Sequence, residues 1–261
     1  MKINKIFILS LTAFGLSLAA LIISINNRQA IAKSNVCQEK AEIINYAGEK
    51  ILYLISPLGR SEYNNLGVVD LKGQKVNLVT LSYKVLFVNS VEKIYSDPIS
   101  LLPVKIERTI SKLWWKDYVT EEYDQKKFTV VIKKSKGKKL VNEQVIKANS
   151  PIQNVILLLF YLRDNPDLKV GWNFIARVLA EFKPEVVSIK LEIVSIDEIK
   201  IPAGKFQAYH FKSIPVKFEV WINKSTPQVP LKIKLKSIFD CSALMKKYTL
   251  NDSSSKPGVK L

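Results

Sequence analysis

The chain has 261 residues, of which 40 are Lys or Arg and 23 are Asp or Glu, for a formal net charge of +17. Its hydrophobic content of 48% is enough for a folded core and excludes a disordered chain. One His and two Cys exclude zinc fingers, four-cysteine clusters and three-histidine sites. The nine Gly residues form neither glycine-rich nucleotide motif, so we expect no cofactor and no metal.

Residues 1–32 have the pattern of a secretory signal peptide. Lys2 and Lys5 precede an uncharged run at 6–25, and Ala30-Ile31-Ala32 supplies a cleavage site of small residues. A run of ~20 apolar residues can also span a bilayer, so an uncleaved inner-membrane anchor remains an alternative. Both alternatives export the body of the chain to the periplasm or cell envelope. Removal of 1–32 takes away three basic residues and lowers the formal charge from +17 to +14.

The two cysteines, Cys37 and Cys241, lie near opposite ends of the exported part. An oxidising compartment permits a disulfide between them. We predict this disulfide over a pair of unpaired thiols, and it would tie the start of the chain to its last strand.

Period-two alternation of apolar residues dominates the body and predicts strands. Between the alternating runs stand turn signals such as Ser135-Lys136-Gly137 and Pro202-Ala203-Gly204. The spacing fits about ten strands in antiparallel meander order. The clearest alternating runs, in chain order, lie at 51–55, 76–80, 128–132, 187–193 and 231–235.

One segment breaks the alternation and predicts a helix. Ser150 and Pro151 are typical of a helix start, and the residues from Val155 to Leu162 are all apolar. A short helix that is apolar on every side is buried. We therefore predict a mainly β protein: a single large curved antiparallel sheet, or half-barrel, of about ten strands with one buried helix in its concave face. The predicted domain is 33–250, and 251–261 is a disordered tail.

The order of these elements resembles the exported bacterial family known as domain of unknown function 3108. The resemblance covers roughly 200 residues. It implies a strongly bent sheet around a helix, similar to the lipoprotein-carrier proteins of the bacterial envelope, which hold acyl chains in a half-barrel. The chain departs from the family's pattern at two places, residues 152–155 at the helix start and Trp172 after Val170-Gly171. The matching segments are 48–59, 101–108, 121–132, 151–164, 168–174, 199–213 and 220–234.

No residue pattern predicts catalysis. His210 lies in an alternating strand with no recognisable partner, and no G-x-S-x-G motif is present. The carboxylates at 121–122, 124 and 197–198 have the spacing of charges on a solvated face rather than of a glycosidase pair. We predict that the protein is not an enzyme.

Lysines concentrate in two places. In the interpretation without a binding role, these lysines keep exposed strands soluble. The functional interpretation is contact with an anionic envelope component, such as lipid headgroups or an acidic glycan. Nucleic acid is excluded as a partner by the exported location. The candidate contact residues are Lys133, Lys134, Lys136, Lys138 and Lys139 on one hairpin, and Lys232, Lys234 and Lys236 on a late strand.

Aromatic and apolar residues around the helix suggest a ligand site. The favoured hypothesis is a non-catalytic module that binds a lipid or other amphipathic ligand between sheet and helix. The alternative is a structural or interaction protein that docks a partner through its basic hairpin or an edge strand. The sequence does not determine the oligomeric state. The candidate ligand-binding residues are Trp114, Trp115, Leu158, Phe160, Tyr161, Trp172 and Phe174.

Overall fold

The computed structural model describes residues 47–56, 59–137, 139–163, 165–180, 185–214, 218–235 and 241–250. The predicted signal segment 1–32, the tail 251–261, Cys37, Lys138 and Lys236 lie outside these residues. Within the described part of the chain, no helix is long and apolar enough to cross a membrane.

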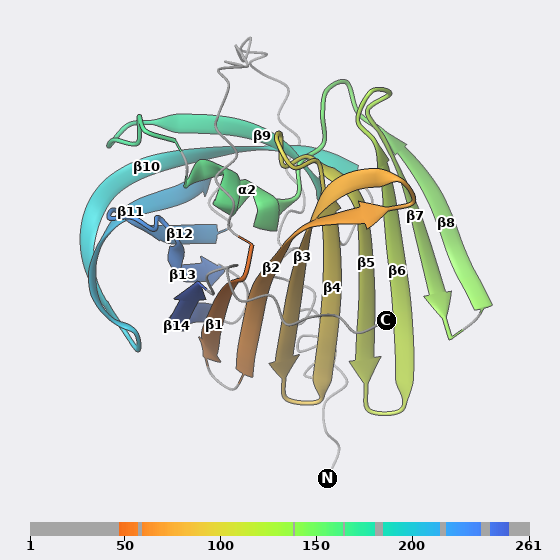
Figure 1. Cartoon of the computed structure of the whole chain (residues 1–261), viewed down its shortest axis with the longest axis horizontal. Coiled ribbons are helices and arrows are strands. Elements are labelled where there is room, and N and C mark those ends of the chain that lie inside the picture. The colour runs from red at the N-terminus through yellow and green to blue at the C-terminus, as the bar shows by residue number, and fades with distance from the viewer. Residues whose placement is uncertain are drawn as a thin grey trace.

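One antiparallel sheet of 14 strands contains every described strand (Figure 1). Its order is β8-β7-β6-β5-β4-β3-β2-β1-β14-β13-β12-β11-β10-β9, so the first and last of the described strands pair in its middle. The first eight strands are β1 (Glu49–Ser56), β2 (Gly59–Leu71), β3 (Gln74–Val85), β4 (Val88–Ser96), β5 (Pro103–Lys112), β6 (Trp115–Asp124), β7 (Thr129–Lys136) and β8 (Lys139–Lys147). After helix α2 (Val155–Leu162) come β9 (Asn173–Ala180), β10 (Glu185–Ile201), β11 (Gly204–Ile214), β12 (Phe218–Asn223), β13 (Pro230–Leu235) and β14 (Cys241–Leu250).

The predicted fold class is confirmed: the protein is mainly β, with one curved antiparallel sheet around a single described helix. The prediction of about ten strands is too low. Strands such as β6, whose sequence WKDYVTEEYD is rich in charged residues, show only weak alternation of apolar and polar residues. Pairing with a neighbouring strand on each side is what makes such a segment a strand.

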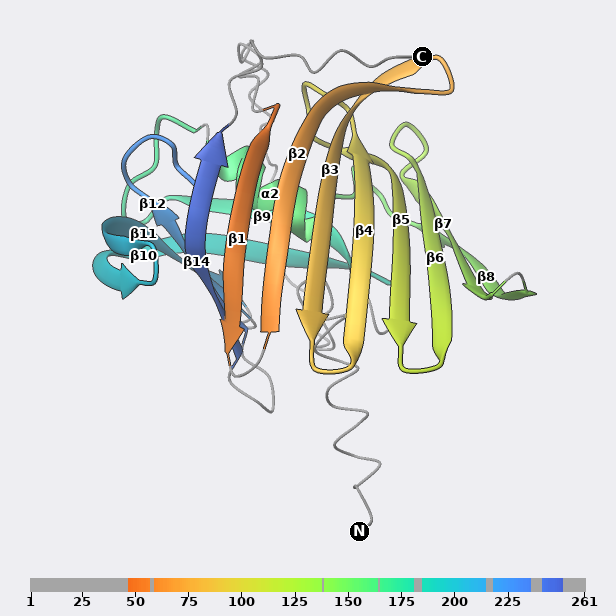
Figure 2. The same ribbon diagram turned by 60° about the horizontal axis from the view of Figure 1, so that its bottom comes forward.

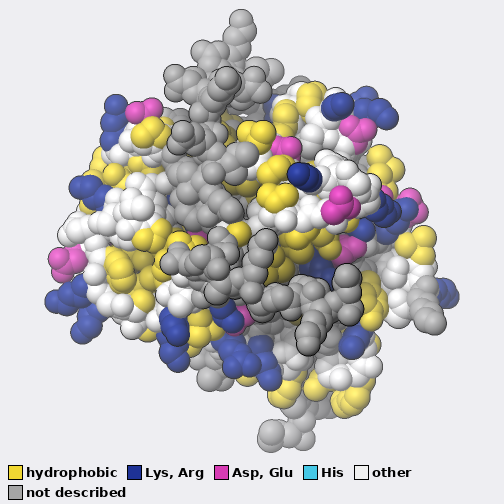
Figure 3. Space-filling view, in the orientation of Figure 1, with side chains coloured by type: hydrophobic (Ala, Val, Ile, Leu, Met, Phe, Trp, Pro, Cys, Tyr) yellow, Lys and Arg dark blue, Asp and Glu magenta, His cyan; other side chains and the backbone are white. Residues whose placement is uncertain are grey.

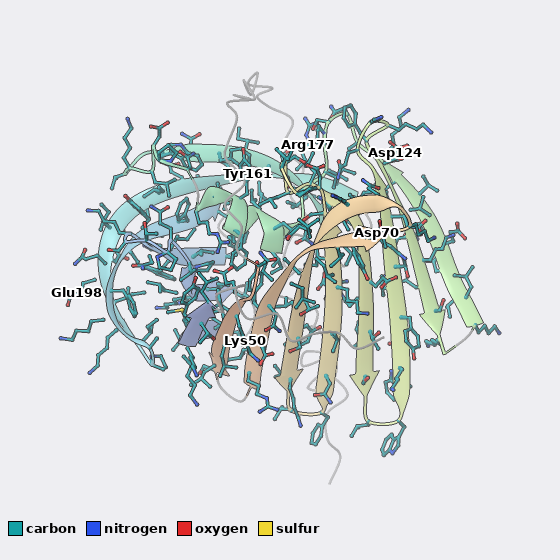
Figure 4. All side chains as sticks on the ribbon, viewed as in Figure 1. Lys50, Asp70, Asp124, Tyr161, Arg177 and Glu198 are labelled. Carbon is teal, nitrogen blue, oxygen red and sulfur yellow. The ribbon has the colours of Figure 1, made fainter. Side chains whose placement is uncertain are left out.

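The sheet curls until its two ends approach each other without forming a closed ladder (Figures 1 and 2). Side chains from β9 and β10 pack against those of β6 to β8 around the buried Ile152. Arg177 on β9 also hydrogen-bonds Asn149 and Ser150, in the connection that follows β8 (Figure 4). The seam between the ends is therefore made mostly of side chains, which leaves the outer backbone edge of β8 unpaired within the described residues.

A bulge shapes the long strand β2. The register with β3 shifts between Asn65 and Gly67, and Gly67 has a φ of 77°. This left-handed conformation suits glycine, and a Cβ there would lie 2.7 Å from that of Ala47. The Asn65 side chain accepts a hydrogen bond from the Gly67 amide, which fixes the bulge.

Candidate functional site

Helix α2 lies in the concave face of the sheet and is fixed at its N-terminal end. The Asn154 side chain accepts hydrogen bonds from the amides of Ile156 and Leu157 at 2.9 and 3.2 Å. Just before the helix, the Gln125 amide group bonds both the N–H and the C=O of Ile152. These contacts join the start of the helix to the turn between β6 and β7.

A buried ion pair fixes the other end of the helix. Nη1 of Arg163 lies 2.7 and 2.9 Å from the two carboxylate oxygens of Glu49, the first residue of β1. The guanidinium also stands 4.9 Å from the ring centre of Phe160, which stacks on Tyr63 at 4.0 Å. Burial, followed by the charge of Glu49, raises the pKa of Tyr53 and of Tyr63 well above that of an exposed tyrosine. The helix is thus tied at both ends to the sheet.

A small apolar cavity lies between α2 and the sheet. Its volume is about 20 Å³ of space for the centre of a water molecule, which is room for roughly one water. The phenol of Tyr53 donates to the Pro230 carbonyl and the Ser61 hydroxyl to that of Ser82, so these two polar groups are already bonded. The cavity is lined by Tyr53, Ser61, Tyr63, Leu81, Ile156, Leu159, Phe160, Pro230, Ile233 and Ala243.

The predicted ligand-binding residues fall into separate groups. Leu158 and Phe160 are buried in the main core. Tyr161, at the exposed side of α2, lies 6.0 Å from Phe174, and Phe174 stacks on Trp172 at 6.2 Å (Figure 4). Trp114 and Trp115 stand at the turn between β5 and β6, away from the helix. The structure therefore joins the aromatic residues of α2 and β9 but not the tryptophan pair.

The predicted basic residues also form two groups. Lys133, Lys134, Lys136 and Lys139 are exposed on β7 and β8, at one end of the sheet order. Lys232 and Lys234 lie on β13, and Lys232 covers the ring of Trp221 at 4.3 Å. Figure 3 accordingly shows basic side chains at several places around this face rather than in one patch.

His210 has charged partners that the sequence did not reveal. Its Nε2 lies 2.8 Å from a carboxylate oxygen of Glu219, and its Nδ1 lies 3.1 Å from one of Asp197. The ring stacks on Trp221 at 4.2 Å, and the Trp221 indole N–H donates to Asp197 at 2.8 Å. Burial acts to raise the pKa of Asp197, but the hydrogen bonds from Trp221 and Ser195 outweigh it and lower that pKa. Alternation places these side chains on one face, but only the strand register brings them together.

A second polar cluster is buried on β4, β5 and β6. Arg108 lies 3.0 Å from Glu92 and 3.8 Å from Glu121, and the Tyr123 hydroxyl donates to Glu121 at 2.6 Å. The expectation that Glu121 lies on a solvated face is wrong, because this side chain is 6% exposed. Burial raises the pKa of Glu121 above that of an ordinary carboxyl group.

The raised pKa of Glu121 gives a pH prediction. Between the pKa of the unfolded chain and the higher pKa of the folded protein, the folded state binds more protons. Glu121 therefore lowers stability as the pH rises through that window. We expect Glu121→Gln to raise the free energy of unfolding at pH 7 relative to the unsubstituted protein, because the neutral amide avoids the cost of burying a carboxylate.

Urea denaturation between pH 4 and 8 checks this prediction. The advantage of Glu121→Gln is expected to shrink as the pH falls, since Glu121 itself then becomes protonated. Glu122→Gln, at the exposed neighbouring position, is the matched control. An advantage of Glu121→Gln that stays constant or grows toward low pH would contradict the assignment.

The fold and this interior define a class, that of barrel-like antiparallel β proteins with a helix packed inside the sheet. The chain belongs to the family DUF3108, described as protein of unknown function, whose model matches residues 60–241. The resemblance predicted from the sequence is thereby confirmed. No curated protein matches the chain.

Two solved structures are similar to the chain. One is a beta-barrel-like protein of domain of unknown function DUF1849 from Brucella abortus, with a TM-score of 0.51 and 8% identity over 78% of this chain and 98% of that one. The other is described as an exported protein with a YmcC-like fold from Bacteroides fragilis NCTC 9343, with a TM-score of 0.27 and 6% identity over 78% and 97%. The Brucella protein supports the barrel-like fold alone. The likeness to lipoprotein carriers stays a prediction.

Proposed function

We propose that the chain is an exported, non-catalytic interaction protein of the cell envelope, which docks a partner along the outer edge of β8. The unpaired edge of β8 carries the proposal. This strand lies at one end of the sheet order (Figure 1). Its side chains Leu140, Val141 and Val145 are exposed. Export rests on the signal pattern of residues 1–32.

The edge of β8 has the features of a strand-addition site. The register with β7 is regular from Asn142 to Lys147, while a shift between Lys134 and Ser135 disturbs only the part near the hairpin turn. A row of outward backbone groups on a regular strand is a template for an extended segment of another chain. The neighbouring Lys134 and Lys139 favour a partner segment with acidic side chains, whereas Lys133 already lies 3.6 Å from Glu143 of β8.

The close packing of α2 against the described part of the sheet favours this function over lipid carriage. The cavity between α2 and the sheet has room for about one water and not for an acyl chain, and α2 is tied to the sheet at both ends. The apolar lining of that cavity supports the binding of an apolar ligand as a second candidate, in which α2 would have to move. Native mass spectrometry of the exported protein with envelope lipids tests it, and a lipid-sized mass lost on denaturation would favour it.

Site-specific photo-crosslinking in the producing cells tests the edge. A crosslinking residue at Val145 is expected to capture one discrete partner, and the combined change Val141→Glu and Val145→Glu to weaken the interaction at least tenfold, because it places negative charges where the acidic partner segment would lie. The matched control is Val91, which is also exposed but lies on β4 between two paired strands. Equal crosslinking at Val91 and Val145, or none at either, would refute docking along β8.

A further inference from the structure

Two neighbouring hairpin turns at one end of the sheet carry large apolar side chains. The turn between β3 and β4 contains Leu86 and Phe87, and the turn between β5 and β6 contains Leu113 and Trp114. The turns lie side by side because Val88, at the start of β4, pairs with Lys112, at the end of β5. Figure 2 shows both at the same level. Their centres are two strand spacings apart, or about 10 Å.

These side chains are among the most exposed apolar groups that the structure describes. Trp114 is 86% exposed, Phe87 69% and Leu113 60%, and Trp115, the first residue of β6, is 50% exposed. Figure 3 shows hydrophobic side chains gathered at this end of the sheet. Exposed aromatic residues on adjacent turns form a contact surface rather than scattered surface residues.

The backbone of both turns is unfavourable for the residues that occupy it. Leu86 has a φ of 48° and Leu113 a φ of 35°, in the left-handed region where Gly or Asn is the usual residue. Neither leucine is buried in the core, so packing does not compensate for this conformation. An apolar residue at these positions therefore serves something other than the stability of the hairpins.

Lysines surround the apolar turns. Lys84 and Lys116 are exposed and stand two residues behind Leu86 and Trp114, a rise of about 7 Å along a strand. Lys136 and Lys139 flank the next turn in the same row, since Asp117 on β6 pairs with Lys136. Within the described residues none of these four lysines forms an ion pair, and the nearby Asp117 lies 3.8 Å from Lys112 instead.

We propose that this end of the sheet docks on an anionic lipid bilayer, with Leu86, Phe87, Leu113 and Trp114 inserted at the interface. Because the two turns end at the same level, both can contact the flat surface of a bilayer simultaneously. Tryptophan and phenylalanine suit the boundary between headgroups and acyl chains, and lysines set behind them reach the lipid phosphates. The strands would then point toward the membrane, and the outer edge of β8 would remain accessible beside it.

Fluorescence quenching by brominated lipids tests the proposal. The exported protein, with the N-terminus that it carries after export, is mixed with vesicles of phosphatidylethanolamine and phosphatidylglycerol that carry bromine on their acyl chains. We expect quenching that falls at least threefold when Trp114 and Trp115 are both replaced by Phe. The other two tryptophans, Trp172 and Trp221, are on β-strand or loop positions packed against the core and report on any contact elsewhere.

The lipid dependence and the turn variants complete the test. Phe87→Ser and Leu86→Asn are each expected to weaken quenching at least fivefold, and 0.5 M salt or vesicles of phosphatidylcholine alone to do the same. Asn suits the left-handed backbone, so Leu86→Asn cannot act by unfolding the hairpin. Ile99→Ser, at an exposed residue in the connection between β4 and β5, is the control and should not change quenching.

Absence of quenching, or quenching that is independent of the turn residues and of lipid charge, would overturn membrane docking. A partner that crosslinks at Val145 while no quenching occurs would leave the proposed function intact and overturn only this inference. Quenching without such a crosslink would do the reverse.

Discussion

Replacing Arg163 by Leu is expected to lower the free energy of unfolding by about 3–5 kcal/mol, because it leaves the Glu49 carboxylate buried without its guanidinium partner. The two side chains are 2% and 0% exposed, so water cannot replace the lost contact. Urea denaturation measures the change. Arg60→Leu, at an exposed position of β2, is the control and should shift stability by less than about 0.5 kcal/mol.

The double variant Glu49→Leu with Arg163→Leu separates the contribution of the ion pair to stability from the contribution of side-chain packing. Replacing both partners by apolar residues of similar size is often neutral, so most of the lost stability should return. A double variant that is as unstable as the two single variants combined would show that the pair does not act as a unit. The outcome also bears on α2, since the ion pair holds its C-terminal end to β1.

Replacing Leu158 by Ala is expected to destabilise the protein by about 2–5 kcal/mol, as for other leucines removed from a packed core. Leu158 is 0% exposed and packs between the helix and the sheet. Thermal and urea unfolding measure the loss, and Leu66→Ala, at an exposed residue of β2, is the control. A change of less than about 1 kcal/mol would mean that the space around α2 is loosely filled and would favour the ligand-binding hypothesis.

Much of the fold follows from the sequence because alternation and turn residues act locally. The segment Leu231 to Leu235 alternates apolar residues with lysines, and the structure places the apolar set in the core. The helix was predictable from its unbroken apolar run after Asn154, but the predicted start at Ser150-Pro151 is wrong: the helix begins at Val155 and Asn154 caps it. Phe160 and Leu158 are buried in the core rather than in a ligand site because the sheet packs closely around the helix. The distance between helix and sheet is set by the tertiary fold, and no local sequence pattern indicates it.

The charged clusters escaped prediction for a related reason. Glu49 and Arg163 are 114 residues apart, and Glu219 meets His210 only through the register of β11 and β12. A sequence shows which face of a strand a side chain occupies but not which neighbour stands opposite. The sequence shows Trp114 as one of two adjacent tryptophans, but only the pairing of β4 with β5 reveals that its turn lies beside the turn that carries Phe87.

The pairing of Cys37 with Cys241 stays a prediction, and the Cys241 thiol donates to the Ser56 carbonyl at 3.3 Å.

The pairing of β1 with β14 has a consequence for biosynthesis. These strands come from opposite ends of the described chain, at 49–56 and 241–250, yet they lie in the middle of the sheet. A ribosome releases β1 before all the other described strands and β14 after them, so the two halves of the sheet cannot join through this pair until residue 250 has emerged. Loss of the final strand would divide the sheet at its centre instead of trimming one side. Such an arrangement keeps a newly made chain from closing early, which is compatible with the export that we propose for this protein.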